Sequence, residues 1–204
     1  DRYLRIVDYK TGIKQFRLGD VYHGLNLQML VYLFTLWKNG KNQFADCLPA
    51  GILYMPSGDK MLTASRETGD EELEKARDKH YKMSGLLLED LVVVKGMEAS
   101  GLGVYIPASV KKDGSLSASS SVVNLAQMGL LSRYIQNLIV QMAVSLRQGE
   151  IAPLPVSGQG YDPCAYCEYA AVCGREKGAP VQELTPLDKA ELFALLKKEE
   201  GEKP

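Results

Sequence analysis

The sequence has no long uninterrupted hydrophobic run, so it lacks the roughly 20 apolar residues in a row that a membrane-spanning helix needs. It also has no excess of one charge, because 24 Lys and Arg balance 25 Asp and Glu to a formal net charge of -1. This balance excludes a strong overall basic field but permits a local DNA groove. With 46% hydrophobic residues among 204, the chain can bury one core and a small appendage.

Cysteine is scarce: the chain has four, and Cys164, Cys167 and Cys173 lie within ten positions as C-x2-C-x5-C. This grouping favours a metal or cluster site over a disulfide framework, and it fits a reducing cytosol. Iron–sulfur clusters usually take four cysteine ligands, and the spacing alone also permits zinc. Three free or buried cysteines are the remaining alternative. We expect Cys47 to be a small core residue.

Residue patterns predict an α/β protein. Residues 3–10 alternate and carry β-branched side chains, which indicates a strand ending at Thr11-Gly12. Residues 21–37 are mostly apolar and predict a buried helix, and residues 50–55 predict a core strand. The other predicted elements are a charged helix over 71–82, a helix over 85–94, a hairpin of 104–110 and 115–121, an amphipathic helix over 125–147, and a last helix capped by Thr185 and ending near Lys198. We expect the apolar stripe of the 125–147 helix to face the core, with an interface as the alternative.

Two polar side chains stand at the end of the first predicted strand. Residues i and i+2 of a strand point to the same side, so Asp8 and Lys10 should face one pocket. A carboxylate there can hold Mg²⁺, with the backbone carbonyl of Tyr9 as a second ligand. Lys10 would orient a metal-bound water and stabilise negative charge on a scissile phosphate. An exposed ion pair is the alternative, because short motifs of this kind often arise by chance.

The predicted helix that follows places Gln28 and Tyr32 one turn apart on one face. Gln28 is a polar residue within an apolar helix, and burying it unpaired would be costly. We therefore expect Gln28 to have a hydrogen-bond partner, either in the strand-end site or on a backbone group of the core.

These motifs carry a resemblance. The run from Ile6 to Gly12, followed by Gln28-x-x-x-Tyr32, resembles the RecB-type branch of the PD-(D/E)xK nucleases. Residues 25–33 and 45–54 resemble more specifically the AddB family, the B subunits of AddAB helicase–nucleases. The similarity runs in patches from about residue 3 to residue 175. It implies a restriction-endonuclease-like α/β core, a mixed sheet flanked by helices, truncated at its N-terminus.

The resemblance also implies an organisation and an activity. The nuclease core would span residues 1–150, the cysteine segment 151–180, and a C-terminal helix and tail 181–204. The activity would be Mg²⁺-dependent DNA exonuclease, in a cytoplasmic, ATP-dependent complex with an AddA subunit that processes double-strand breaks for homologous recombination. The implied site residues are Asp8 and Tyr9 as metal ligands, Lys10 as the catalytic lysine, and Gln28 and Tyr32 as residues that brace the site and approach DNA.

In the family, Cys164, Cys167 and Cys173 would match ligands of a [4Fe-4S] cluster whose fourth cysteine lies upstream of this chain. The family also has an upstream acidic metal ligand in a strand with the pattern Gly-x-x-Asp, and this ligand is likewise absent from the 204 residues. We therefore expect the isolated fragment to cleave DNA poorly or not at all, and to hold iron poorly. Two alternatives stay open: a CRISPR-associated RecB-like exonuclease, and a non-enzymatic metal-binding interaction module.

Overall fold

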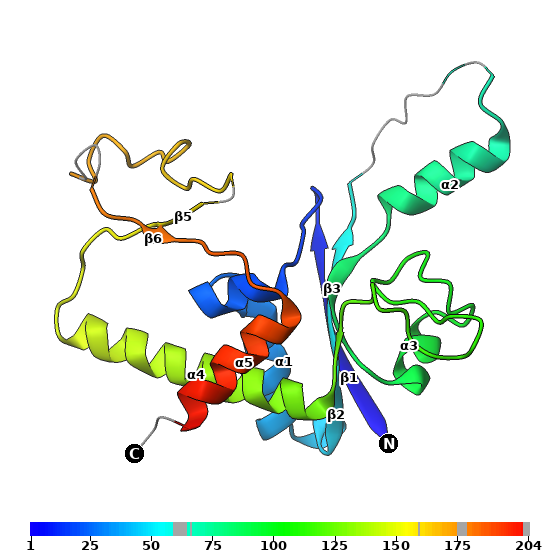
Figure 1. The fold of residues 1–204 in the computed structure, drawn as a ribbon, viewed down its shortest axis with the longest axis horizontal. Coiled ribbons are helices and arrows are strands. Elements are labelled where there is room, and N and C mark those ends of the chain that lie inside the picture. Colours follow the sequence, from blue (N-terminus) through cyan, green and yellow to red (C-terminus); the bar gives the residue numbers. More distant parts are fainter. Residues whose placement is uncertain (59–64, 66, 159, 175–178, 202–204) are drawn as a thin grey trace. The chain divides into compact units, whose positions relative to one another are not determined.

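The computed structural model describes residues 1–58, 65, 67–158, 160–174 and 179–201. The chain divides into two compact units. We call residues 1–17 and 26–132 the sheet unit, and residues 18–25 and 133–204 the helical unit. Figure 1 shows the elements of both, with colour following the sequence.

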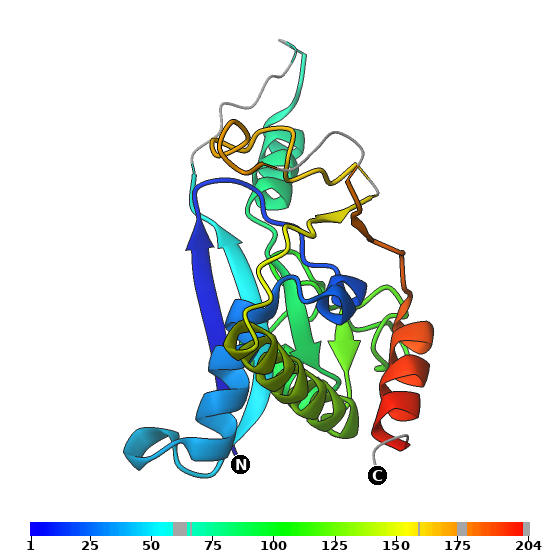
Figure 2. The ribbon, with the colours of Figure 1, turned by 90° about the vertical axis from the view of Figure 1, so that its left-hand side faces the viewer.

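A mixed sheet with the strand order β1-β2-β3-β4 forms the centre of the sheet unit. β1 and β2 run parallel and lie side by side at one edge of the sheet (Figure 2), β3 is antiparallel to β2, and β4 is parallel to β3. The strands are β1 (Arg2–Lys10), β2 (Cys47–Pro56), β3 (Ser84–Leu88) and β4 (Val122–Val123), and the helices are α1 (Leu27–Asn39), η2 (Asn42–Phe44), α2 (Asp70–His80) and α3 (Leu91–Met97). The predicted mixed sheet flanked by helices is confirmed.

Apolar side chains cover both faces of this sheet. On one face, Leu53 of β2 and Leu87 of β3 pack in a buried cluster with Val94 of α3. On the other side of the sheet from α3 lies α1 (Figure 1), which contacts β1 and β2 and buries Met29, Leu30, Leu33 and Phe34. The buried helix that the apolar run predicted is therefore confirmed for this part of the run, and its buried residues recur at helical spacing. The core therefore holds the carboxyl ends of β1 and β2 in place.

The prediction of one helix over residues 85–94 is wrong. Residues up to Leu88 form β3, which fills the sheet between β2 and β4, and a new helix begins at Leu91. Asp90 separates the two elements, because its side chain accepts hydrogen bonds from the backbone N–H groups of Val92 (2.7 Å) and Val93 (3.2 Å). A short leucine run has no helical or strand period of its own, so pairing with neighbouring strands decides its structure.

The predicted hairpin of residues 104–110 and 115–121 is reduced to one isolated bridge between Val110 and Leu116. The loop before it is organised by the carboxylate of Glu98 instead. The Glu98 oxygens accept hydrogen bonds from the hydroxyl of Ser100 and from the backbone N–H groups of Gly103, Val104, Tyr105 and Ile106. These backbone donors are satisfied by a side chain, so the segment does not need a sheet ladder.

The helix predicted over residues 21–37 begins later than expected. Residues Leu18–His23 form the 3-10 helix η1, and α1 starts only at Leu27. Gly24 and Asn26 between them have positive φ angles of 77° and 58°, which no α-helix accommodates. The apolar content of the run gives no sign of this turn.

The helical unit contains η1, the later part of α4 (Leu125–Arg147), β5 (Val156–Ser157), β6 (Gln182–Glu183) and α5 (Lys189–Gly201). Tyr22 of η1 stacks on Tyr134 of α4, with ring centroids 5.7 Å apart. The predicted cap of α5 is wrong in detail. Asp188 rather than Thr185 caps it, since Asp188 Oδ1 accepts from Glu191 N (2.8 Å) and Glu191 Oε2 accepts from Asp188 N (2.9 Å).

The helix predicted over residues 125–147 is confirmed with the same bounds. Its apolar stripe is buried only in the first half: Met128 and Leu131 are inaccessible, whereas Met142 and Leu146 are 45% and 69% exposed. The expectation that the whole stripe faces the core is therefore wrong.

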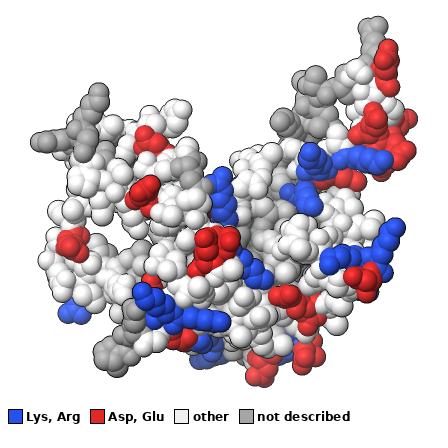
Figure 3. All heavy atoms as spheres, viewed as in Figure 1, with Lys and Arg blue, Asp and Glu red and all other residues white. Residues whose placement is uncertain are grey.

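In the described part of the chain, no helix is both long and apolar enough to cross a membrane. Acidic and basic side chains are interspersed on the face shown in Figure 3.

Candidate active site

Asp8 and Lys10 lie on one side of β1 at its carboxyl end, as the strand alternation predicted. Lys10 Nζ is 2.7 Å from Asp8 Oδ2, and the side chains of Lys10 and Asp8 are 40% and 33% exposed respectively. The hydrogen bond to Asp8 raises the pKa of Lys10, against a smaller opposing effect of burial. Lys10 is therefore an ammonium group at neutral pH. It can donate hydrogen bonds to an anion, and it cannot serve as a general base.

A buried tyrosine stands beside this pair. Tyr54 of β2 lies opposite Asp8 in the parallel register, and Pro56 lies opposite Lys10. Burial raises the pKa of Tyr54, the charge of Asp8 raises it further, and Lys10 partly offsets both. Tyr54 is thus a neutral phenol next to the carboxylate. Sequence reasoning did not propose it as a site residue, because the apolar run of residues 50–55 predicts a core strand but not which residue of β1 lies opposite Tyr54.

The chain after Lys10 turns back over the ends of the strands. Ser57 N donates to Lys10 O (2.8 Å), which extends the pairing of the two chain segments beyond the sheet. Phe16 then stacks on Tyr54, with ring centroids 6.4 Å apart, and its backbone N–H donates to Ser84 Oγ (3.0 Å). The Asp8–Lys10 pair therefore lies next to a loop that is anchored on β2 and β3.

Gln28 and Tyr32 form a second pair on α1. Gln28 Nε2 donates to Tyr32 Oη at 3.1 Å, and both side chains are exposed, Tyr32 by 51%. The premise that Gln28 is buried is wrong, and its partner is Tyr32 rather than a group of the core. The structure thus brings Asp8 together with Lys10 and Gln28 together with Tyr32, and among the described residues no hydrogen bond or ion pair joins the two pairs.

The cysteines do not converge. Cys47 is buried, as expected of a core residue, whereas Cys167 and Cys173 are exposed and Cys164 is partly exposed; all four are free thiols. Nowhere in the described ranges do three His, Cys, Asp or Glu side chains gather so that they could hold a metal ion. The arrangement of Cys164, Cys167 and Cys173 therefore gives no support to the predicted [4Fe-4S] cluster.

Comparison with known proteins adds to this geometry. The family model described as the PD-(D/E)XK nuclease superfamily matches residues 1–174. The B subunit of the ATP-dependent helicase/deoxyribonuclease of Acetivibrio thermocellus is 37% identical over 174 residues, 84% of this chain and 15% of that protein. Its namesake from a Thermoanaerobacter species is 33% identical over 204 residues, 98% of this chain and 18% of that protein. The namesake from Clostridium acetobutylicum is 39% identical over 174 residues, which are again 84% of this chain and 15% of that protein. The chain thus spans less than a fifth of these relatives.

Proposed function

Because this chain belongs to the PD-(D/E)XK nuclease superfamily, we propose that it is the nuclease part of a DNA exonuclease. The observation that carries the proposal is the Asp8–Lys10 pair: a carboxylate and an ammonium group 2.7 Å apart, both partly exposed, at the end of β1. The reaction is hydrolysis of a phosphodiester bond in DNA. Residues 1–150 are the proposed nuclease core.

The residues have separate roles in this proposal. Asp8 pairs with Lys10 through Oδ2, which leaves Oδ1 as a hard oxygen ligand of the kind that Mg²⁺ prefers, and the carbonyl of Tyr9 offers another. When bound, Mg²⁺ supplies an acidic water and positive charge at the phosphoryl oxygens. The Lys10 ammonium donates a hydrogen bond to a phosphoryl oxygen as negative charge develops there. The exposed Gln28–Tyr32 pair contacts the DNA strand.

The ligand set is incomplete within the described residues, which gather no group of three potential metal ligands. One carboxylate and one carbonyl leave most positions of an octahedral Mg²⁺ to water. We therefore propose that the 204 residues alone bind Mg²⁺ weakly and cleave DNA poorly, and that full activity needs ligands from outside them. The weak binding of Mg²⁺ follows from the small number of metal ligands at Asp8. It does not follow from a defect of the sheet, which is well formed.

The names of the relatives support a wider role. Each is named as the B subunit of an ATP-dependent helicase/deoxyribonuclease. We propose that this chain works in the same kind of complex, together with an AddA helicase–nuclease subunit in the cytoplasm. ATP-driven unwinding would present a single DNA strand to the Asp8–Lys10 site during double-strand break repair by homologous recombination.

Cleavage by the complete gene product tests the nuclease proposal. We expect Mg²⁺-dependent degradation of end-labelled DNA, slowed about 10²- to 10³-fold by Lys10→Met because a preorganised donor is lost. Lys95→Met, an exposed lysine of α3, is the matched control and should leave the rate unchanged. Equal rates for Lys10→Met and wild type would overturn the proposal. Robust degradation by the 204-residue chain alone would overturn the proposed incompleteness of its metal site.

The [4Fe-4S] cluster is proposed only for the longer protein, where a fourth cysteine could join Cys164, Cys167 and Cys173. No step of the cleavage depends on it. Anaerobic purification followed by iron and sulfide analysis decides the matter. The complete gene product should carry iron that a Cys167→Ser variant loses, whereas the 204-residue chain should carry little. Iron-free complete protein would rule the cluster out.

A further inference from the structure

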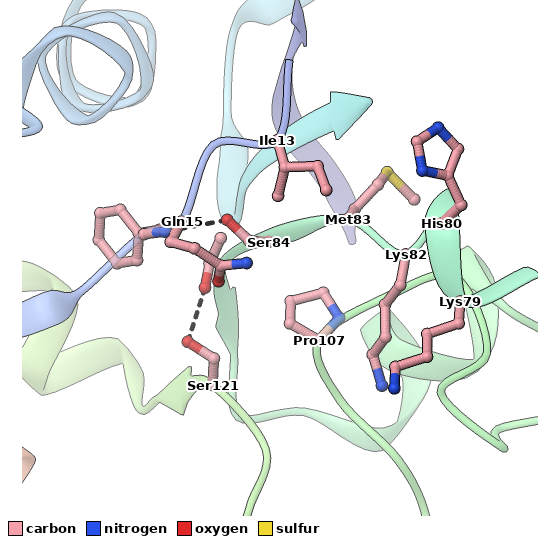
Figure 4. A pocket seen from close by; sticks show the side chains of 11 residues that line it. Ile13, Gln15, Lys79, His80, Lys82, Met83, Ser84, Pro107 and Ser121 are labelled. Carbon is pink, nitrogen blue, oxygen red and sulfur yellow. Dashed lines mark hydrogen bonds between the residues drawn. The ribbon is translucent and has the colours of Figure 1, made fainter. Parts of the chain in front are cut away.

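The sheet unit contains a cavity of about 480 Å³ beside the first residues of β3 (Figure 4). It exists because β4 pairs only with Leu87 and Leu88, which leaves the start of β3 without a strand on that side. The loop of residues 13–16 and the end of α2 line the cavity, and Pro107 closes part of it.

Several polar groups of the cavity are engaged in holding its walls. Ser84 Oγ donates to Lys14 O (2.7 Å) and accepts from the backbone N–H of Phe16 (3.0 Å). Ser121 Oγ donates to Gly85 O (2.6 Å). The Ser84 bonds join the loop after β1 to the start of β3, and the Ser121 bond joins the residue before β4 to it, so the cavity is a built feature of the fold.

Three other polar side-chain groups of the lining have no hydrogen-bond or ion-pair partner among the described residues. Within the described part of the chain, the ammonium groups of Lys79 and Lys82 and the amide of Gln15 form no side-chain hydrogen bond or ion pair. Lys79 lies near the end of α2 and Lys82 just after it, and their side chains extend in the same direction (Figure 4). The nearby carboxylate of Asp78 accepts a hydrogen bond from Tyr105 Oη (2.6 Å), so it is already engaged.

His80 also lines the cavity, with Nε2 2.9 Å from Gly58 O, and Ile13, Met83 and Pro107 give the same space an apolar surface. Two cations, one free amide and an apolar surface together fit a ligand that carries an anion next to a flat, weakly polar group. A nucleotide within a single DNA strand has this composition, and grooves that bind single strands combine cationic and stacking surfaces in this way.

The cavity is connected to the Asp8–Lys10 site through one row of the sheet. Asp8 pairs with Tyr54, and Tyr54 pairs with Ser84, so the three residues lie in line across β1, β2 and β3. At a strand spacing of about 4.8 Å, the cavity begins about 10 Å from Asp8. Phe16 bridges the two places, because it stacks on Tyr54 and lines the cavity.

We propose that this cavity holds a nucleotide of the DNA strand a short distance from the scissile phosphate, an inference that rests on the proposed function. Lys79 and Lys82 contact its phosphate, and Gln15 is available to its polar edge. The base lies against Ile13 and Met83. The cavity thereby fixes the path of a single strand across the ends of β2 and β3.

Salt-dependent binding tests the phosphate contacts. Anisotropy of a labelled single-stranded oligodeoxynucleotide is measured with the 204-residue chain in a chelator, so that no cleavage occurs. Each neutralised phosphate contributes about 0.7 to the slope of log affinity against log salt, and the two lysines contact one phosphate, so Lys79→Gln with Lys82→Gln should lower the slope by about 0.7. Over a fourfold rise in salt, wild type then loses about 2.6-fold more affinity than the double variant. Lys111→Gln with Lys112→Gln, in an exposed loop, is the matched control.

Ile13→Ala tests the base contact separately. Ile13 is 61% exposed, so its truncation should not disturb the core. We expect a several-fold weaker affinity with an unchanged salt slope, because the lost contact is not electrostatic. Unchanged affinity of Ile13→Ala would remove the base from the proposal.

A wild-type salt slope in the Lys79/Lys82 variant, an equal fall in the control, or no binding by wild type would overturn the cavity as a DNA site. These results leave the Lys10 cleavage test untouched. Conversely, the salt slope could fall as expected while Lys10→Met cleaves DNA at the wild-type rate. That result would overturn the nuclease proposal and retain the cavity as a DNA site.

Discussion

The carboxylate of Glu98 provides the sharpest test of how the sheet unit is held together. Its Oε1 accepts from Ser100 Oγ (3.0 Å), Gly103 N (2.7 Å) and Val104 N (3.0 Å), and its Oε2 accepts from Tyr105 N (2.9 Å) and, less closely, Ile106 N (3.4 Å). In a Glu98→Gln variant, the side-chain NH₂ must replace one of these oxygens. Placed at the Oε2 position, it would face two backbone donors that then have no acceptor.

The expected cost follows from these contacts. Losing the charged acceptor of Tyr105 N costs about 1.5–3 kcal/mol, and the other bonds weaken when the charge is removed. We expect the free energy of unfolding to fall by about 2–3 kcal/mol at neutral pH, measured by urea denaturation of the 204-residue chain. Glu71→Gln is the control, because the ion pair that Glu71 forms among the described residues is with exposed Lys75 on α2, and its loss should change stability little.

The same variant predicts a pH dependence. Burial acts to raise the pKa of Glu98, but hydrogen bonds from Tyr105, Val104, Ser100 and Gly103 outweigh it, so the pKa lies below its ordinary value. A lowered pKa in the folded state stabilises the protein above the unfolded pKa of about 4.3, and this stabilisation is lost as the pH falls through the folded pKa. The difference between wild type and Glu98→Gln should therefore shrink as the pH falls below about 4.3. A difference that is absent at neutral pH, or constant with pH, would refute the reasoning.

Four further changes test the fold by urea or thermal unfolding. Gly51→Ala should destabilise the protein by about 3 kcal/mol or more, because the φ angle of Gly51 is +138° and an added Cβ would lie 2.2 Å from Leu86 O. Gly96→Ala should instead stabilise the protein by about 0.4–1 kcal/mol, because an added Cβ would have nothing within 4 Å. Asp188→Ala removes the cap of α5 and should cost about 1 kcal/mol. Leu33→Ala empties a fully buried site on α1 and should cost about 2–5 kcal/mol. Wild-type stability in any destabilising variant would contradict the described packing.

Local sequence was sufficient wherever one period governed an element. The alternation of residues 3–10 predicted β1 and placed Asp8 and Lys10 on one side, as the 2.7 Å ion pair shows. The three- and four-residue spacing of residues 125–147 predicted the bounds of α4. Side-chain direction in a strand or helix is a property of neighbouring residues, so no distant contact was needed for either.

Tertiary structure decided everything that depends on a partner far along the chain. Only the register of β1 with β2 brings Tyr54 opposite Asp8, and only pairing with β2 and β4 makes residues 84–88 a strand rather than a helix. The exposure of Gln28 and the cavity beside Lys79 likewise depend on how elements pack. Periodicity predicts the face of its own helix or strand on which a side chain lies. The pairing and packing between elements determine which residues that side chain contacts.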